Sequence, residues 1–324
     1  MTDSGVIHSS SQTLAGFRVH VHQYQPTNRP IEDRYSISNS ESQNRVLFGV
    51  YDGHGGSATA EYISTTLPST ILAHTPAEHA RLFQDTDNDL VQKFAKDHSF
   101  FGTKSKDWVR NAQLVKSGCT ALVIDVNIDT LTASFANSGD CRAVVFESKQ
   151  RSGKLQQTED LNAKTPSEKE RLLREHPGED SVIVGGRLFG RIMSTRGFGD
   201  AYYKLPLGTI SNWQHKRYIS ALSSVEDNGK VTMSEQYTSM FHHYRTPPYL
   251  TAIPMVGTFQ LSSGSFVIMA TDGLWDCVSS EVAVETVRRG TEQGADNLAE
   301  YLLNVVKAIK SPGDDVTIVL IQVP

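Results

Sequence analysis

The feature that most constrains this chain is the repeated placement of an aspartate beside a glycine at the end of an apolar strand. The pattern occurs at residues 50–56 (VYDGHGG), 270–276 (ATDGLWD) and 312–317 (PGDDVT). A fourth acidic pair, Glu32 and Asp33, lies just before another predicted strand. A single aspartate of this kind usually belongs to a turn or a cap. Acidic residues at several strand ends instead favour a site for a hard divalent cation, since Mg²⁺ and Mn²⁺ prefer oxygen ligands.

Hydrophobic periodicity predicts an α+β fold with a largely antiparallel sheet. Consecutive predicted strands are joined by short turns, and the predicted helices are grouped between these runs of strands, which is typical of this class. The predicted strands are residues 17–24, 45–51, 120–126, 131–137, 142–147, 265–271 and 316–323, and the predicted helices are residues 57–67, 76–100, 165–176 and 298–309. Thr165 and Glu168 have the spacing of a capping box at the start of the third helix.

The chain is predicted to form one large domain with two irregular parts. Residues 1–14 are predicted to be a flexible tail and residues 15–324 the domain, because 38% hydrophobic and 21% charged residues are ordinary globular composition. Residues 201–250 show weak periodicity, which predicts a long insertion or flap. Its aromatic residues are Tyr202, Tyr203, Trp213, His215, Tyr218, Tyr237, His242, His243 and Tyr244. Two interpretations stay open, namely recognition of a protein partner through these side chains or surface elaboration without a partner.

Charge and cysteine content exclude several classes of protein. The net charge is −5 and the sequence pI is about 6.1, so an overall basic field for nucleic acid is not expected. No apolar run approaches the roughly 18–20 residues that a transmembrane helix needs. Three cysteines, an odd number, do not make a disulfide framework. Together with a polar N-terminus that lacks signal or transit character, these features predict an intracellular protein.

The glycines after Asp52 do not predict a nucleotide-binding loop. The chain has no G-x-x-x-x-G-K-[ST] sequence, and a carboxylate at the start of such a loop would repel phosphate unless a metal lay between them. No cysteine has an arginine six residues downstream, which disfavours a cysteine-dependent phosphatase. Asp87 and Asp89 match the short pattern of aspartyl-phosphate enzymes, but the apolar residues around them have helical spacing, which disfavours that chemistry.

An ordered set of short motifs resembles the metal-dependent protein serine/threonine phosphatases of type 2C. The motifs are DGHGG at 52–56, SGCTA at 117–121, NSGDCR at 137–142, STRGFGD at 194–200, DGLWD at 272–276 and DDVT at 314–317. Each motif is weak alone, but their order over roughly residues 15–324 is specific. The resemblance implies a central β-sandwich of two antiparallel sheets flanked by helices, with a binuclear metal site at one end.

The resemblance also implies a role for each residue that would bind metal. Asp52 would bridge two Mg²⁺ or Mn²⁺ ions, and the carbonyl of Gly53 would bind one of them. Asp272 and Asp314 would bind the other ion, and Glu32 would hold metal-bound water. Two such ions lower the pKa of a bridging water and neutralise phosphate oxygens, which suits direct attack of that water on phosphorus.

Further residues are carried over for acid catalysis and substrate binding. His54 would be the general acid that protonates the leaving alkoxide. The family often has a phosphate-binding arginine four residues before the glutamate of its first motif, whereas Arg29 lies three residues before that glutamate, so Arg29 is a candidate that departs from the pattern. Asp140, Asp200 and Asp276 match acidic positions of the family, although Asp140 can equally hold a tight turn and Asp200 can end a strand.

The resemblance implies hydrolysis of phosphoserine and phosphothreonine in proteins. Within the family the chain is most similar to the pyruvate dehydrogenase phosphatases, on residues 30–34 (PIEDR), 187–191 (RLFGR), 246–252 (TPPYLTA) and the insertion after Asp200. This implies phosphorylated pyruvate dehydrogenase as partner and substrate, a location in the mitochondrial matrix with cytoplasm or nucleus as alternatives, and a monomer without nucleic-acid or membrane partners. The alternative is a catalytically dead phosphatase fold that acts as a scaffold, and retention of the three metal-binding aspartates favours the enzyme.

Overall fold

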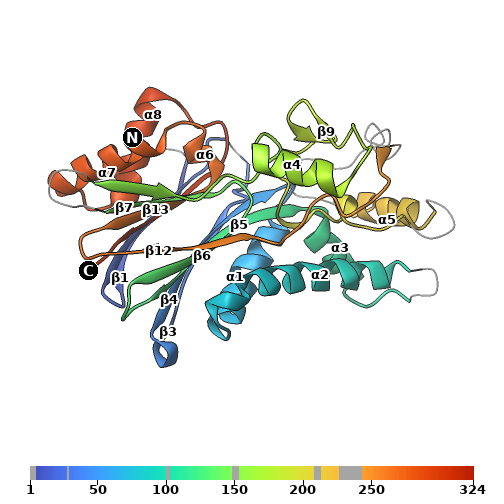
Figure 1. Cartoon of the computed structure of the whole chain (residues 1–324), viewed down its shortest axis with the longest axis horizontal. Coiled ribbons are helices and arrows are strands. Elements are labelled where there is room, and N and C mark those ends of the chain that lie inside the picture. The colour runs from blue at the N-terminus through green and yellow to red at the C-terminus, as the bar shows by residue number, and fades with distance from the viewer. Residues whose placement is uncertain (1–4, 28, 100–102, 148–152, 208–212, 226–242) are drawn as a thin grey trace.

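Two antiparallel β-sheets packed face to face form the body of the molecule (Figure 1). The computed structural model describes residues 5–324 except 28, 100–102, 148–152, 208–212 and 226–242. The first sheet has the strand order β1 (Val6–Leu14), β2 (Phe17–Tyr24), β14 (Val316–Gln322), β13 (Phe266–Ala270), β7 (Arg142–Glu147) and β8 (Lys154–Gln157). The second sheet has the order β12 (Met255–Gln260), β6 (Thr132–Ser138), β5 (Gly118–Asn127), β4 (Arg45–His54) and β3 (Arg34–Ser40), with β11 (Phe198–Gly199) paired to β5. The predicted α+β sandwich is confirmed.

Helices cover both outer faces of the sandwich. The helices on the second sheet are α1 (Ala58–Leu72), α2 (His79–Asp97) and α3 (Trp108–Lys116), and those over the first sheet are α6 (Asp272–Trp275), α7 (Ser280–Glu292) and α8 (Leu298–Ile309). Short 3₁₀ turns are η1 (Glu41–Gln43), η2 (Pro76–Glu78) and η3 (Ala201–Tyr203). Within the described ranges, no helix has the length and apolar character needed to cross a bilayer.

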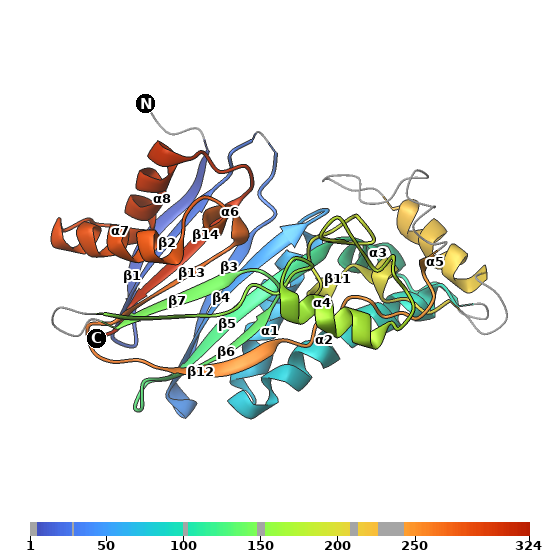
Figure 2. The same cartoon turned by 45° about the horizontal axis from the view of Figure 1, so that its top comes forward.

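A separate group of elements lies at one end of the sandwich and is here called the end region, which means the described residues between 161 and 250 (161–207, 213–225 and 243–250). It contains α4 (Pro166–Glu175), the hairpin of β9 (Ile183–Val184) and β10 (Arg187–Leu188), and α5 (Trp213–Ser223). Figure 2 shows α5 at the end of the molecule opposite α7 and α8, with α4 between them. The end region therefore adjoins one set of strand ends and leaves the other set uncovered.

Strand β4 illustrates how the core positions the strand ends. Val46, Phe48 and Val50 pack between the two sheets, whereas Leu47 and Tyr51 face the helices beneath the second sheet, and all five are fully buried. This alternation follows from the two-residue period of a β-strand. A strand that is buried on both faces appears in the sequence as a continuous apolar run. The strand is therefore held rigidly up to the aspartate that follows Tyr51.

The prediction of a flexible tail over residues 1–14 is wrong for residues 6–14. Strand β1 pairs with β2 along its length, from Val6 opposite Tyr24 to Leu14 opposite Phe17. Its sequence, VIHSSSQTL, lacks apolar alternation because β1 is an edge strand and most of its side chains are exposed. Backbone hydrogen bonds hold it in place, and side-chain patterns do not report such bonds. Residues 1–4 lie outside the described residues.

Helix α4 begins where it was predicted, but the predicted capping box does not form. The side chain of Thr165 accepts no hydrogen bond from the helix N-terminus. Its hydroxyl donates instead to the carbonyl of Asp160, at 2.6 Å. The proline ring fixes φ of Pro166 near a helical value, and its nitrogen has no N–H that would need a capping partner. The helix can therefore begin at Pro166 without a capping box.

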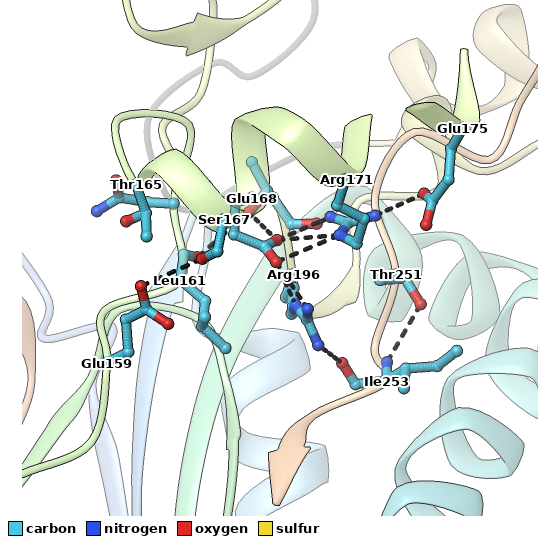
Figure 3. A network of polar contacts seen from close by, with 12 residues as sticks. Glu159, Leu161, Thr165, Ser167, Glu168, Arg171, Glu175, Arg196, Thr251 and Ile253 are labelled. Carbon is cyan, nitrogen blue, oxygen red and sulfur yellow. Dashed lines mark hydrogen bonds and ion pairs between the residues drawn. The ribbon is translucent and has the colours of Figure 1, made fainter. Parts of the chain in front are cut away.

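Glu168, the other residue of the predicted box, links α4 to the segment before β11 (Figure 3). Its buried carboxylate accepts hydrogen bonds from Arg171 at 2.8 Å, from Arg196 at 2.6 Å and from the hydroxyl of Thr195 at 2.7 Å. Burial alone would raise the pKa of Glu168, but the bonds from Arg196 and Arg171 lower it to about 2. Arg196 also donates to the carbonyl of Ile253, at 2.8 Å. These bonds fix the chain that leads into Asp200.

Most of the aromatic residues of the predicted flap are core residues. Tyr202, Tyr203, His215, Tyr218 and Tyr244 are each 6% exposed or less. The rings pack on one another, with centroids 4.6 Å apart for His215 and Tyr244. The interpretation of these five side chains as anchors for a partner is therefore wrong. Of the remaining ones, His243 is exposed, whereas Tyr237, His242 and the side chain of Trp213 lie outside the described residues.

Candidate active site and metal centre

The strand ends beside the end region surround a cavity of about 510 Å³. The sandwich side of the cavity carries the carboxylates of Glu32, Asp52, Asp140, Asp272, Asp276 and Asp314, together with Gly53, His54 and Gly55. The end region contributes Lys164, Arg187, Arg191, Ile192, Met193, Ser194, Tyr202 and Tyr203. All of the residues that the family resemblance assigns to metal therefore line one cavity, although they come from four separate parts of the chain.

Two glycines let these acidic segments approach one another. A Cβ atom on Gly53 would lie 2.4 Å from the carbonyl oxygen of Glu32, and one on Gly273 would lie 2.0 Å from that of Asp315. The backbone N–H of Glu32 donates to the carboxylate of Asp315 at 2.7 Å, and the Glu32 carboxylate accepts from the N–H of Gly56 at 2.8 Å. Any larger residue at either glycine would separate the strand ends, so the Asp-Gly pattern has a steric cause.

Three of the carboxylates form a tight cluster. Asp52, Asp140 and Asp272 each place an oxygen within 4.8 Å of the other two. Burial, followed by the charge of Asp272, raises the pKa of Asp52 well above its ordinary value. Burial and the charge of Asp140 raise the pKa of Asp272 to about 7. Like charges at this spacing cannot all ionise without a compensating cation. Carboxylate oxygens this close together, on the buried Asp140 and the half-buried Asp52 and Asp272, fit a hard divalent cation such as Mg²⁺ or Mn²⁺.

His54 pairs with Asp200 at the side of this cluster. Its Nε2 lies 2.6 Å from the carboxylate of Asp200, which is fully buried. Burial alone would lower the pKa of His54, but the charge and hydrogen bond of Asp200 raise it above its ordinary value. Gly118 makes the contact possible, since a Cβ there would lie 2.1 Å from both Nε2 and the Asp200 carboxylate. The imidazole is thereby held in one orientation and favoured in its charged form.

Hydrogen bonds to neighbouring elements hold the segment that carries Asp200 in place. Asp200 has a left-handed backbone with φ of 48°, and its N–H donates to the carbonyl of Ser117 at 3.0 Å. Asp87 accepts from the N–H of Gly199 at 2.9 Å and from Lys204 at 2.6 Å. Asp87 lies within α2 and has these structural partners, so it is not an aspartyl-phosphate nucleophile, as its helical spacing indicated.

The cysteines also agree with the sequence interpretation. Cys119 and Cys141 are fully buried, and burial raises the pKa of both thiols well above the ordinary value. A thiol that stays protonated is a poor nucleophile. The cavity therefore relies on carboxylates and an imidazole rather than on thiol chemistry.

Arg29 is not among the residues that line the cavity. It is exposed, and its backbone N–H donates to the hydroxyl of Thr27 at 3.3 Å. The cations that do line the cavity are Lys164, Arg187 and Arg191, none of which was predicted from the sequence. The only sequence signal for the two arginines was their place in the RLFGR segment, and nothing in that segment indicates which way their side chains point.

Comparison with known proteins places these observations in a family. The family model described as Protein phosphatase 2C matches residues 17–314. The mitochondrial pyruvate dehydrogenase (acetyl-transferring) phosphatase 2 of Homo sapiens is 29% identical over 80% of this chain and 59% of its own length. A protein phosphatase 2C homolog of Schizosaccharomyces pombe is 29% identical over 81% of this chain and 60% of its own length. The chain thus spans about three fifths of the length of these curated relatives.

Solved structures show the same fold. A phosphatase from a pathogenic strain of Toxoplasma gondii superimposes with a TM-score of 0.64 at 16% identity, covering 98% of this chain and 95% of that chain. A Caenorhabditis elegans sex determining protein superimposes with a TM-score of 0.60 at 17% identity, covering 96% of this chain and 65% of that chain. These identities support the fold alone, whereas the family model covers nearly the whole chain. The chain belongs to the protein phosphatase 2C family.

Proposed function

We propose that this protein is a metal-dependent phosphatase that hydrolyses phosphoserine and phosphothreonine in other proteins. The observation that carries the proposal is the cluster of Asp52, Asp140 and Asp272, whose closely spaced carboxylates and raised pKa values call for a bound cation. His54 lines the same cavity and supplies a protonated group beside it. Family membership supports the same reaction class.

In this proposal four residues would hold two Mg²⁺ or Mn²⁺ ions, namely Asp52, Gly53 through its carbonyl, Asp272 and Asp314. Asp140 would add its charge beside Asp52 and Asp272, and Glu32 would orient water there. When bound, such ions supply an activated water for in-line attack on phosphorus and neutralise the phosphate oxygens. The chain contributes the fixed spacing of its carboxylates, which the close contacts at its glycines set. Because this arrangement exists before substrate arrives, little reorganisation is needed during the reaction.

His54 is the proposed general acid. The leaving oxygen of serine or threonine is a strongly basic alkoxide, so its departure requires a proton. Since Nε2 is bonded to Asp200, Nδ1 is the atom that carries the transferred proton. A buried carboxylate that orients a catalytic imidazole and stabilises its charged form has the same role in other hydrolases.

The specific substrate that we propose is phosphorylated pyruvate dehydrogenase, with the mitochondrial matrix as the place of action. The support is the similarity to phosphatases named for that substrate. A direct test compares dephosphorylation of purified phospho-pyruvate dehydrogenase with that of an unrelated phosphoprotein at equal concentration. Equal rates on the two proteins would contradict the substrate assignment without affecting the proposed chemistry.

The reaction itself is tested by metal removal. Purified protein should hydrolyse both a phosphoserine peptide and p-nitrophenyl phosphate in Mn²⁺ or Mg²⁺, and excess chelator should abolish both activities. Return of the metal should restore them. Full activity in chelator would contradict the proposal, and absence of activity with metal bound would leave the scaffold alternative.

The acid role of His54 is tested by His54→Gln with two kinds of leaving group. We expect the rate on a phosphoserine peptide to fall about 10²–10⁴-fold, the usual contribution of general acid catalysis. The loss on p-nitrophenyl phosphate should be far smaller, because a phenolate of low pKa leaves without a proton. Equal losses on both substrates would show that His54 positions water or metal instead.

A further inference from the structure

The cavity has two walls of opposite charge. The wall on the sandwich side, called here the acidic wall, carries six carboxylates, and among the described residues that line it there is no lysine or arginine. The end-region wall carries Lys164, Arg187 and Arg191, and its described lining residues include no carboxylate. Cations repel divalent metal, so this second wall, called here the basic wall, is suited to a different and anionic ligand.

A compact loop presents Arg187 and Arg191. Strands β9 and β10 are joined by Gly185 and Gly186, whose φ values of 58° and 71° are those that a two-residue hairpin needs. Leu188 is fully buried and anchors the hairpin. Nη1 of Arg187 donates to the carbonyl of Arg191 at 3.0 Å, which takes one of the five guanidinium donors. The two arginines thus belong to a pre-formed loop, and binding through it costs little ordering entropy.

Lys164 reaches the same wall from a neighbouring backbone segment. The N–H of Ala163 donates to the carbonyl of Met193 at 2.8 Å, and Met193 itself lines the cavity. The N–H of Lys164 donates to the side chain of Asn162 at 3.0 Å, which fixes the local turn. Lys164 and Arg187 are exposed, so they lie at the mouth of the cavity rather than at its base.

On the basis of the proposed function, we propose that the basic wall selects phosphoprotein substrates that carry aspartate or glutamate next to the phosphorylated residue. When metal and the phosphoryl group are bound at the acidic wall, the polypeptide on either side of the phosphoserine lies at the mouth of the cavity. Exposed cations there complement acidic side chains in that polypeptide. The competing explanation is that the three cations only balance the six carboxylates, in which case their removal would change every substrate equally.

The test uses two phosphoserine peptides of equal length, one with aspartate at the two positions on either side of the phosphoserine and one with alanine there, together with p-nitrophenyl phosphate. For the wild type we expect kcat/KM to favour the acidic peptide by about tenfold at low ionic strength, and the preference to shrink at high salt. Lys164→Ala combined with Arg187→Ala should remove the preference. The change on the alanine peptide and on p-nitrophenyl phosphate should stay within about twofold.

The matched control is Lys169→Ala combined with Arg174→Ala, which removes the same charges from exposed positions on α4 that do not line the cavity. The control should keep the full preference. A preference that survives in the Lys164/Arg187 variant, or an equal loss on all three substrates, would overturn the inference. Equilibrium binding of the two peptides, measured by fluorescence anisotropy, reports the preference without turnover. Absence of hydrolysis would then contradict the proposed function, while the binding ratio would still decide this inference.

Discussion

The acidic wall of the cavity and the aromatic interior of the end region bury polar atoms in opposite ways. In the interior, the hydroxyl of Tyr244 donates to the carbonyl of Leu205 at 2.7 Å, and that of Tyr249 donates to the carboxylate of Glu179 at 2.5 Å. In the acidic wall, Asp52 and Asp272 lie close to other carboxylates and have raised pKa values. These two hydroxyls are therefore satisfied within the chain, whereas the charges of the acidic wall become favourable only with a cation from solution. Residues of the first kind serve stability, and residues of the second kind serve a ligand.

The substitution Asp272→Asn, which removes one charge from the acidic wall, should have the largest effect. We expect kcat/KM on p-nitrophenyl phosphate to fall by more than about 100-fold, since one metal loses a charged ligand. In chelator the same variant should resist urea better than the wild type, because one of several repelling charges is gone. Asp129→Asn, at an exposed turn, is the control and should change neither quantity. Lower stability of the Asp272 variant without metal would contradict the assigned repulsion.

The substitution Tyr244→Ala tests whether the aromatic interior of the end region contributes to stability. Loss of a tyrosine that is 2% exposed should cost about 3–5 kcal/mol of unfolding free energy through the cavity it leaves. Tyr244→Phe should cost about 1 kcal/mol, the value of one internal hydrogen bond. Urea unfolding measures both, with the exposed His243→Ala as control. Unchanged stability with weakened binding of a protein substrate would restore the partner-recognition interpretation of this residue.

The dependence of stability on pH should change when metal is added. Asp272 has a pKa of about 7, and the pKa values of Asp52 and His54 are raised, so near neutral pH these three groups hold more protons in the folded metal-free protein than in the unfolded chain. These groups therefore stabilise the metal-free fold increasingly as the pH falls from 8 to 6. Four histidines whose pKa values burial lowers act in the opposite direction, namely His20, His98, His176 and His215. Bound Mg²⁺ removes the first contribution, because protons then compete with metal, and leaves the histidines unchanged. Urea unfolding at pH 6, 7 and 8 should therefore show a larger loss of stability on acidification in Mg²⁺ than in chelator, and equal slopes would count against the site.

Arg29→Ala should have the smallest effect. Arg29 is exposed and does not line the cavity, so we expect kcat/KM on p-nitrophenyl phosphate to change by less than about twofold, as for surface charges in general. The measurement separates the exposed N-terminal segment from the cavity itself. A loss of about tenfold or more would show that Arg29 moves into the cavity with substrate.

The acidic site could be predicted because its physical causes are local. Asp52 and Asp272 each follow an apolar run and precede a glycine, and strand ends of one sandwich converge in space. The partner of His54 was harder to predict, since Asp200 lies 146 residues away and reaches it only through a left-handed backbone and the missing side chain of Gly118. Local residue type carries no record of such contacts.

The end region and β1 show why other parts could not be predicted. The buried aromatic residues of the end region lie on short helices and irregular segments, so their burial follows neither a 3.6-residue nor a two-residue period. Strand β1 is polar and is held by main-chain bonds to β2. In both cases the determining contacts are made by distant segments, and a pattern within a single window does not contain them.

The position of β14 has a consequence for how the protein is made. Ile318 lies between His22 of β2 and Ala270 of β13, so the first sheet stays divided until β14 arrives. During translation this is the last of the described strands to leave the ribosome, and Asp314 emerges just ahead of it. Until then β2 and β13 have unpaired edges, which invite aggregation or chaperone binding. A nascent chain therefore gains the strand that joins the two parts of its first sheet and the last carboxylate of its acidic wall at nearly the same time.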